Sequence, residues 1–116
     1  MSKILTVPYN REKLEIPYGC IVRIFAEHNY SHIFFANGID ILVLLQLGII
    51  WKMLVVEHPF VFTHRSQFVN FDFANRMSKN DRKLLLMKIG KPVIVSETYI
   101  LDINQRLSKR NKPPFE

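Results

Sequence analysis

The sequence contains four histidines and one cysteine, which are residue types common among metal ligands and nucleophiles. His28 and His32 have the spacing of zinc ligands, but their neighbours favour a strand, a turn and a second strand, and no acidic residue lies beside them at helical spacing. Ser66 follows His64 by two positions, without the glycine-framed turn that presents a nucleophilic serine. We therefore expect no enzyme activity, no metal, no cofactor and no small-molecule substrate.

The net charge of the chain indicates a polyanionic partner. The chain has 16 Lys and Arg residues against 10 Asp and Glu residues, a formal net charge of +6. A basic domain of this size is attracted to polyanions, of which nucleic acid is the commonest. Charge speaks to association and says nothing about the fold.

The compartment follows from the same composition. Cys20 has no second cysteine to pair with, which fits a reducing cytoplasm, and we expect it to be a small buried side chain. The segment 1–8 is too short and interrupted for a signal peptide. The apolar segment 41–56 is shorter than the ~20 residues of a membrane span, so we interpret it as a strand followed by a core helix. A short helix lying in a membrane surface is the alternative.

These groups must be positioned by a mainly β domain, because aromatic and β-branched residues are abundant. The Asn37-Gly38 pair is a strong hairpin signal, since both residues tolerate positive φ. We predict strands over 14–16, 21–27, 30–36, 39–44, 60–63, 68–70, 71–77, 82–89 and 93–95.

Two helices interrupt or end this series. Apolar residues recur at helical spacing in Gln46–Val55, and Pro59 follows the end of that segment. Tyr99–Leu107 predicts a terminal helix, with Ser96 as its N-cap. This order of elements excludes an alternating βαβ nucleotide-binding fold.

Three segments carry a family resemblance. Phe60–Asn70, with the sequence FVFTHRSQFVN, closely resembles the signature of LytTR domains, named for the LytR and AlgR regulators. Ile21–Tyr30 resembles the first core strand of that family and the turn after it. Val93–Ser96, followed by Tyr99, resembles the closing motif.

The resemblance covers 14–107. It implies short antiparallel strands in small sheets, with one short internal helix and a C-terminal helix. It also implies a bacterial transcription regulator, like the output domain of a response regulator, that binds double-stranded DNA through loops in successive major grooves. Here it would be a stand-alone version, with 1–13 as an N-terminal arm and 108–116 as a basic, disordered tail. Homodimeric or tandem binding on DNA stays open.

Carried over residue by residue, the resemblance implies a set of DNA contacts on loops. Arg65 is the main candidate for a base contact, because arginine can bond guanine O6 and N7 together, worth ~1–3 kcal/mol of discrimination. Ser66 would bond a phosphate. The full set is Asn29, Ser31, His32, His64, Arg65, Ser66, Lys79, Arg82 and Thr98.

Several of these positions, and two others in the same motifs, have a plainer alternative. His64 and Asn70 would each satisfy a local turn, and Tyr30, in the loop that enters the second strand, would belong to the core. Lys79 and Arg82 would be ordinary solvated charges.

Two departures from the family pattern open a different function. Phe62 replaces a cation found in many members, and Glu97 stands where members often carry basic residues. A protein-interaction module on the same fold, which modulates another regulator, is therefore the second hypothesis. A regulator associated with a membrane protein is the third.

Overall fold

The computed structural model describes residues 3–55 and 57–110. Over these residues the chain forms ten β-strands, two α-helices and two 3-10 turns, which confirms the mainly β fold class. The strands are β1 (Ile4–Tyr9), β2 (Glu12–Pro17), β3 (Ile21–Glu27), β4 (Tyr30–Phe35), β5 (Asp40–Val43), β6 (Phe60–His64), β7 (Gln67–Asn70), β8 (Ala74–Met77), β9 (Leu84–Met87) and β10 (Val93–Ile94). The helices are α1 (Leu47–Met53) and α2 (Glu97–Arg110), and the 3-10 turns are η1 (Tyr18–Cys20) and η2 (Phe71–Phe73).

A five-stranded antiparallel sheet lies at the centre, with the strand order β5-β4-β3-β7-β6. Phe25 of β3 lies opposite His32 of β4 on one side and opposite Gln67 of β7 on the other. Side chains alternate between the two faces of a strand, so this register places these three residues on the same face.

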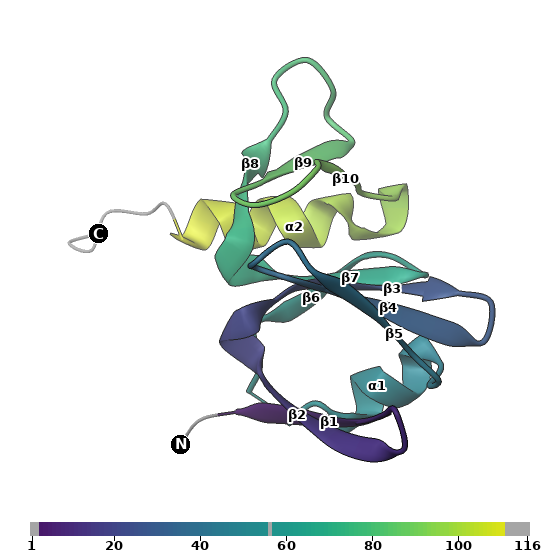
Figure 1. Ribbon diagram of the computed structural model, residues 1–116. Helices are drawn as coiled ribbons and strands as arrows, with labels where there is room; N and C mark the ends of the chain where they lie inside the picture. The colour runs from purple at the N-terminus through teal and green to yellow at the C-terminus, as the bar shows by residue number, and fades with distance from the viewer. Residues whose placement is uncertain (1–2, 56, 111–116) are drawn as a thin grey trace.

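The β1–β2 hairpin and α1 cover the opposite face (Figure 1). Ile24, Ile33 and Phe68 point into this first core, together with Leu5 and Val7 from β1. The alternation of Leu5 and Val7 with more exposed neighbours turns one face of β1 into the core.

The face that carries Phe25 is covered only in part. Over β6 and β7 it packs against α2 and the three-stranded sheet β10-β9-β8, which together enclose a second core (Figure 1). Val61 and Val69 enter this core from the sheet, and Ile103 and Leu107 enter it from α2. The remainder of this face, over β3, β4 and β5, stays partly exposed.

Several expected boundaries differ from the observed ones. Part of the segment expected to be an N-terminal arm forms β1, which pairs with β2 through a two-residue turn at Asn10 and Arg11, with φ of 51° and 67°. At the Asn37-Gly38 turn only Gly38 has positive φ, and the Asn37 side chain accepts a bond from the Ile39 amide. Helix α2 continues to Arg110, and 111–116, most of the expected tail, lie outside the described residues.

Other boundaries differ over shorter stretches. Phe71–Phe73 form η2 rather than a strand, because the buried Asn70 side chain caps that turn. Cys20 is exposed at the end of η1, so the expectation that it is buried was wrong.

Candidate functional site

Three segments distant in sequence meet at one edge of the molecule. The Ala26 amide donates to the Ser66 carbonyl at 2.8 Å, which holds the β6–β7 turn beside the end of β3. The Ser96 amide donates to the Thr63 carbonyl, also at 2.8 Å, which holds the start of α2 beside the same turn. Figure 1 shows the β3–β4 turn and the start of α2 on the same side of the molecule. We call this set of segments the loop edge.

The β6–β7 turn presents three of the predicted contacts. His64 Nδ1 accepts a bond from the Ser66 amide at 3.1 Å, as the turn interpretation of His64 expected. Because Nδ1 is the acceptor, the proton of the neutral ring lies on Nε2, which leaves Nε2 as a donor. Arg65 is exposed at the tip of the turn, and Ser66 is half-buried.

The β3–β4 turn contributes Asn29, which is exposed and accepts a 3.5 Å bond from Gln46. His32 lies further along β4, stacked on Phe25 with 4.8 Å between ring centroids. Its Nε2 lies 3.1 Å from a Glu27 carboxylate oxygen and its Nδ1 lies 3.5 Å from one of Asp40. His32 is therefore 20% exposed on a sheet face and flanked by two acids, rather than free at a loop tip.

Two expectations for this strand were wrong. Ser31 is completely buried, and its hydroxyl donates to the Leu45 carbonyl at 2.8 Å, so it cannot contact DNA in this conformation. Tyr30, expected in the core, is 43% exposed. The alternation along β4 turns Ser31 toward the first core and Tyr30 away from it.

The remaining predicted contacts lie near α2. Thr98 is exposed in its first turn, next to Glu97, whose carboxylate pairs with Lys83 at 3.2 Å. Lys79 and Arg82 are exposed in the β8–β9 loop, which projects beyond α2 (Figure 1). The loop edge therefore gathers Asn29, His64, Arg65, Ser66 and Thr98. Lys79 and Arg82 lie in the projecting loop, and His32 lies on the sheet face.

Phe62 packs against other aromatic rings and gives the loop edge no positive charge. Its ring packs against Trp51, Phe68 and Tyr99, with centroid distances of 4.4, 5.4 and 5.9 Å. At the position where the family resemblance implies a cation, this chain therefore has an aromatic ring that packs against other rings.

A groove beside the β6–β7 turn contains Arg23, which the sequence interpretation did not single out. The groove has a volume of about 440 Å³, and its walls come from β3, the β6–β7 turn and β10. Burial lowers the pKa of Arg23 from its ordinary value, although a guanidinium stays protonated in proteins. The sequence signal that could have pointed to it is an arginine between the apolar residues Ile21, Val22, Ile24 and Phe25 of a predicted strand.

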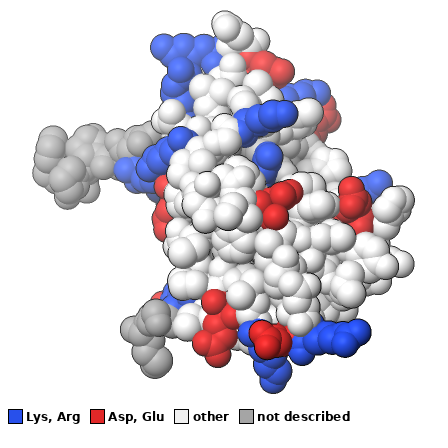
Figure 2. All heavy atoms as spheres, in the orientation of Figure 1, with Lys and Arg blue, Asp and Glu red and all other residues white. Residues whose placement is uncertain are grey.

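The distribution of charge is mixed. Figure 2 shows Lys and Arg interspersed with Asp and Glu over the visible face, rather than gathered in one basic field. On this face, the net charge of +6 does not form one continuous basic surface.

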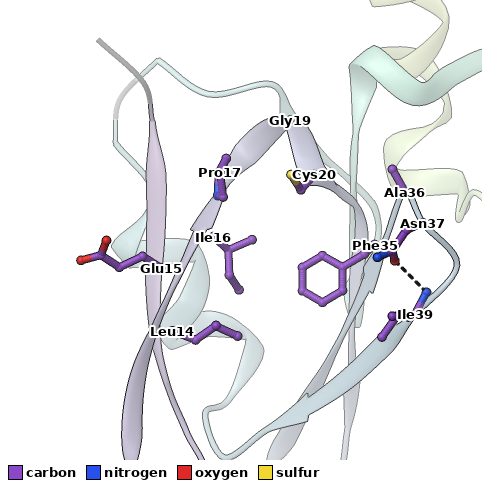
Figure 3. A pocket seen from close by; sticks show the side chains of 10 residues that line it. All are labelled: Leu14, Glu15, Ile16, Pro17, Gly19, Cys20, Phe35, Ala36, Asn37 and Ile39. Atoms are coloured by element: carbon purple, nitrogen blue, oxygen red, sulfur yellow. Dashed lines mark hydrogen bonds between the residues drawn. The ribbon is translucent and has the colours of Figure 1, made fainter.

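A second pocket lies at the other end of β3, with a volume of about 460 Å³ (Figure 3). Leu14, Ile16, Phe35 and Ile39 form apolar walls, and Cys20 lies at its rim. These walls fit an apolar side chain or molecule and not an anion.

The described part of the chain offers neither a metal site nor a membrane span. Among residues 3–55 and 57–110, no group of three or more His, Cys, Asp or Glu side chains has an arrangement that could hold a metal ion. Neither helix in those ranges has the length and apolar character needed to cross a bilayer.

Comparison with known proteins defines the class of fold. No protein-family model matches the sequence, and no curated protein matches it. The fold is that of a LytTR domain, as the sequence resemblance implied. A solved LytTr DNA-binding domain of a methyl-accepting/DNA response regulator from Bacillus cereus superposes with a TM-score of 0.71 and 18% identity. The match covers 92% of this chain and 98% of that domain.

Proposed function

We propose that this chain binds double-stranded DNA with its loop edge and regulates bacterial transcription, with loops that enter successive major grooves. The single observation that carries the proposal is the convergence of the β3–β4 turn, the β6–β7 turn and the start of α2 on one edge. The fold supports it, because the Bacillus cereus domain of the same fold is described as DNA-binding.

The exposed side chains of the β6–β7 turn suit this role. Arg65 presents a guanidinium that can bond guanine O6 and N7 in a major groove. The Nε2 proton of His64 and the Ser66 hydroxyl can donate to phosphate oxygens or base acceptors. Asn29 and Thr98 extend the same edge to either side.

Selection from a random duplex library tests the proposal. We expect an enriched sequence whose log K falls linearly with log salt, because phosphate neutralisation releases counterions. Arg65→Ala should weaken binding about tenfold and relax preference at one base position. Lys13→Ala removes an exposed cation on the β1–β2 hairpin, which covers the other face, and should change the affinity less than about twofold.

Binding that is absent, or that does not depend on salt, would contradict DNA binding. The stoichiometry of the complex would distinguish a homodimer from tandem binding on one duplex.

Acidic side chains at the loop edge favour one second candidate. Glu97 lies beside Thr98 at the loop edge, and Glu27 and Asp40 flank His32 on the adjoining sheet face, so a polyanion bound at the loop edge would approach acidic side chains. A module that binds another regulator would tolerate this mixture. Affinity capture that returns a protein partner but no duplex, and that is lost in Arg65→Glu, would support this candidate.

A further inference from the structure

Arg23 places its own positively charged guanidinium in the groove beside the loop edge. Its guanidinium carbon lies 5.3 Å from the centroid of the Phe34 ring and 5.7 Å from that of Phe25, so two aromatic rings fix the side chain. No carboxylate of residues 3–55 or 57–110 forms an ion pair with it, unlike Arg106, whose Nε lies 3.0 Å from Asp102. Within the same ranges its Nε is buried without a hydrogen-bond partner.

The walls of the groove add further donors. His64 directs Nδ1 to the Ser66 amide, which leaves Nε2 to donate, and Ser66 contributes a hydroxyl. Pro92, Val93 and Ile94 form an apolar wall from β10. None of the residues that line the groove is acidic, and the nearby Glu27 carboxylate is bonded to His32.

We propose that this groove binds a phosphate group, contributed by the DNA backbone next to the bases that Arg65 contacts. This rests on the proposed function and extends it to a residue on a strand. A planar guanidinium bonds two phosphate oxygens at once, and rings that already fix it reduce the entropy lost on binding. The neighbouring donors match the remaining phosphate oxygens, and the position beside the β6–β7 turn is continuous with the loop edge.

The first experiment measures the affinity of the full chain for the selected duplex over a series of salt concentrations. Arg23→Met keeps an unbranched side chain against the two rings and removes the charge. We expect about tenfold weaker binding and a log–log slope shallower by about 1, because one phosphate contact is lost. Arg23→Lys should fall between Arg23→Met and wild type, since an ammonium cannot bond two oxygens in the same fork geometry.

Lys13→Gln is the control, because it also removes one positive charge. It should leave the affinity nearly unchanged and the log–log slope within about 20% of the wild-type slope. Circular dichroism and thermal melts would show that each variant is folded. The second experiment follows the arginine side-chain Nε–H signals by NMR during titration with inorganic phosphate, against sodium chloride at equal ionic strength. The Arg23 signal should shift saturably with phosphate only, while the signal of Arg106, already paired with Asp102, stays unchanged.

The outcomes separate the two proposals. Duplex binding that is identical in wild type and Arg23→Met would overturn the phosphate groove and leave DNA binding intact. No duplex binding by wild type, with a saturable phosphate shift at Arg23, would overturn DNA binding and the backbone as the source of the phosphate. A hexaglutamate peptide that saturates the Arg23 signal at lower concentration than the duplex would assign the groove to carboxylates and overturn a phosphate ligand.

Discussion

The Asn70 side chain donates to the Tyr18 carbonyl at 3.1 Å, across 52 positions of sequence, and also accepts from the Asp72 amide at 2.9 Å. It is completely buried, so the chain junction before β3 and the turn after β7 share one side chain.

Asn70→Ala should therefore lower the free energy of unfolding by about 1–3 kcal/mol, because the Asp72 amide loses its acceptor and the Tyr18 carbonyl keeps only the bond from the Ile21 amide. Urea denaturation measures the change. Asn75→Ala, at an exposed position of β8, should cost much less. Equal losses in the two variants would contradict a structural role for the Asn70 amide.

Arg110 fastens the end of α2. Its guanidinium donates to the carbonyls of Phe71, Ala74 and Asn75 at 3.0, 2.9 and 2.9 Å, and it lies 4.7 Å from the Phe71 ring centroid.

Arg110→Ala should lower the free energy of unfolding by about 1–3 kcal/mol and increase amide exchange in the last turn of α2. Lys109→Ala, an exposed neighbour in the same turn, is the matched control. Unchanged amide exchange in the last turn of α2 in Arg110→Ala would contradict the role of Arg110 in holding that end of the helix.

His58 should make stability depend on pH. Burial, followed by the positive charges of Lys3 and Arg106, lowers the pKa of His58 below its ordinary value of 6.5. Its Nδ1 accepts from the Phe60 amide at 3.1 Å, and its ring packs nearly perpendicular to that of Trp51, with 4.8 Å between centroids.

Because the folded pKa is depressed, the unfolded chain binds the proton first as pH falls. The contribution of neutral His58 to the stability of the fold is thus present above about pH 6.5. It is lost as the pH falls from there through the pKa of His58 in the folded state. Urea denaturation between pH 8 and 5 should show that the free energy of unfolding falls less with decreasing pH in His58→Gln than in wild type. His28→Asn, in an exposed turn where Asn tolerates the φ of 56°, should keep the wild-type decline.

Glu97 should oppose DNA binding. Its carboxylate is 83% exposed beside Thr98, so its pairing with Lys83 contributes little to stability. Glu97→Gln should raise duplex affinity by about two- to fivefold at low salt and change unfolding by less than about 1 kcal/mol. Fluorescence anisotropy measures the affinity, with Glu12→Gln on the β1–β2 hairpin as control. Weaker binding in Glu97→Gln would indicate that the carboxylate contacts a base instead.

Sequence patterns predicted the strands of the central sheet well, because their β-branched residues and turn signals have few other interpretations. β3 has the predicted bounds, and β4 begins at the predicted residue. β1 was missed because Pro8 suggested an irregular arm. The hairpin sheet has only β1 and β2, so each strand has a free edge where proline is tolerated.

The face of each strand was harder to predict than its existence. Ser31 is buried and Tyr30 exposed, the reverse of their polarities, because the Leu45 carbonyl satisfies the serine and the register fixes both. Arg23 escaped notice for a related reason: its stacking on Phe34 depends on a cross-strand neighbour that local sequence does not reveal. Whether the predicted contacts touch DNA stays a prediction.

The exposed thiol of Cys20 offers a practical consequence. It is the chain's single cysteine, and it precedes β3, whereas the β3–β4 turn follows that strand. Seven extended residues separate the two ends by roughly 20 Å. A maleimide fluorophore would therefore attach at one defined point, remote from the loop edge, and report on complex formation without obstructing it.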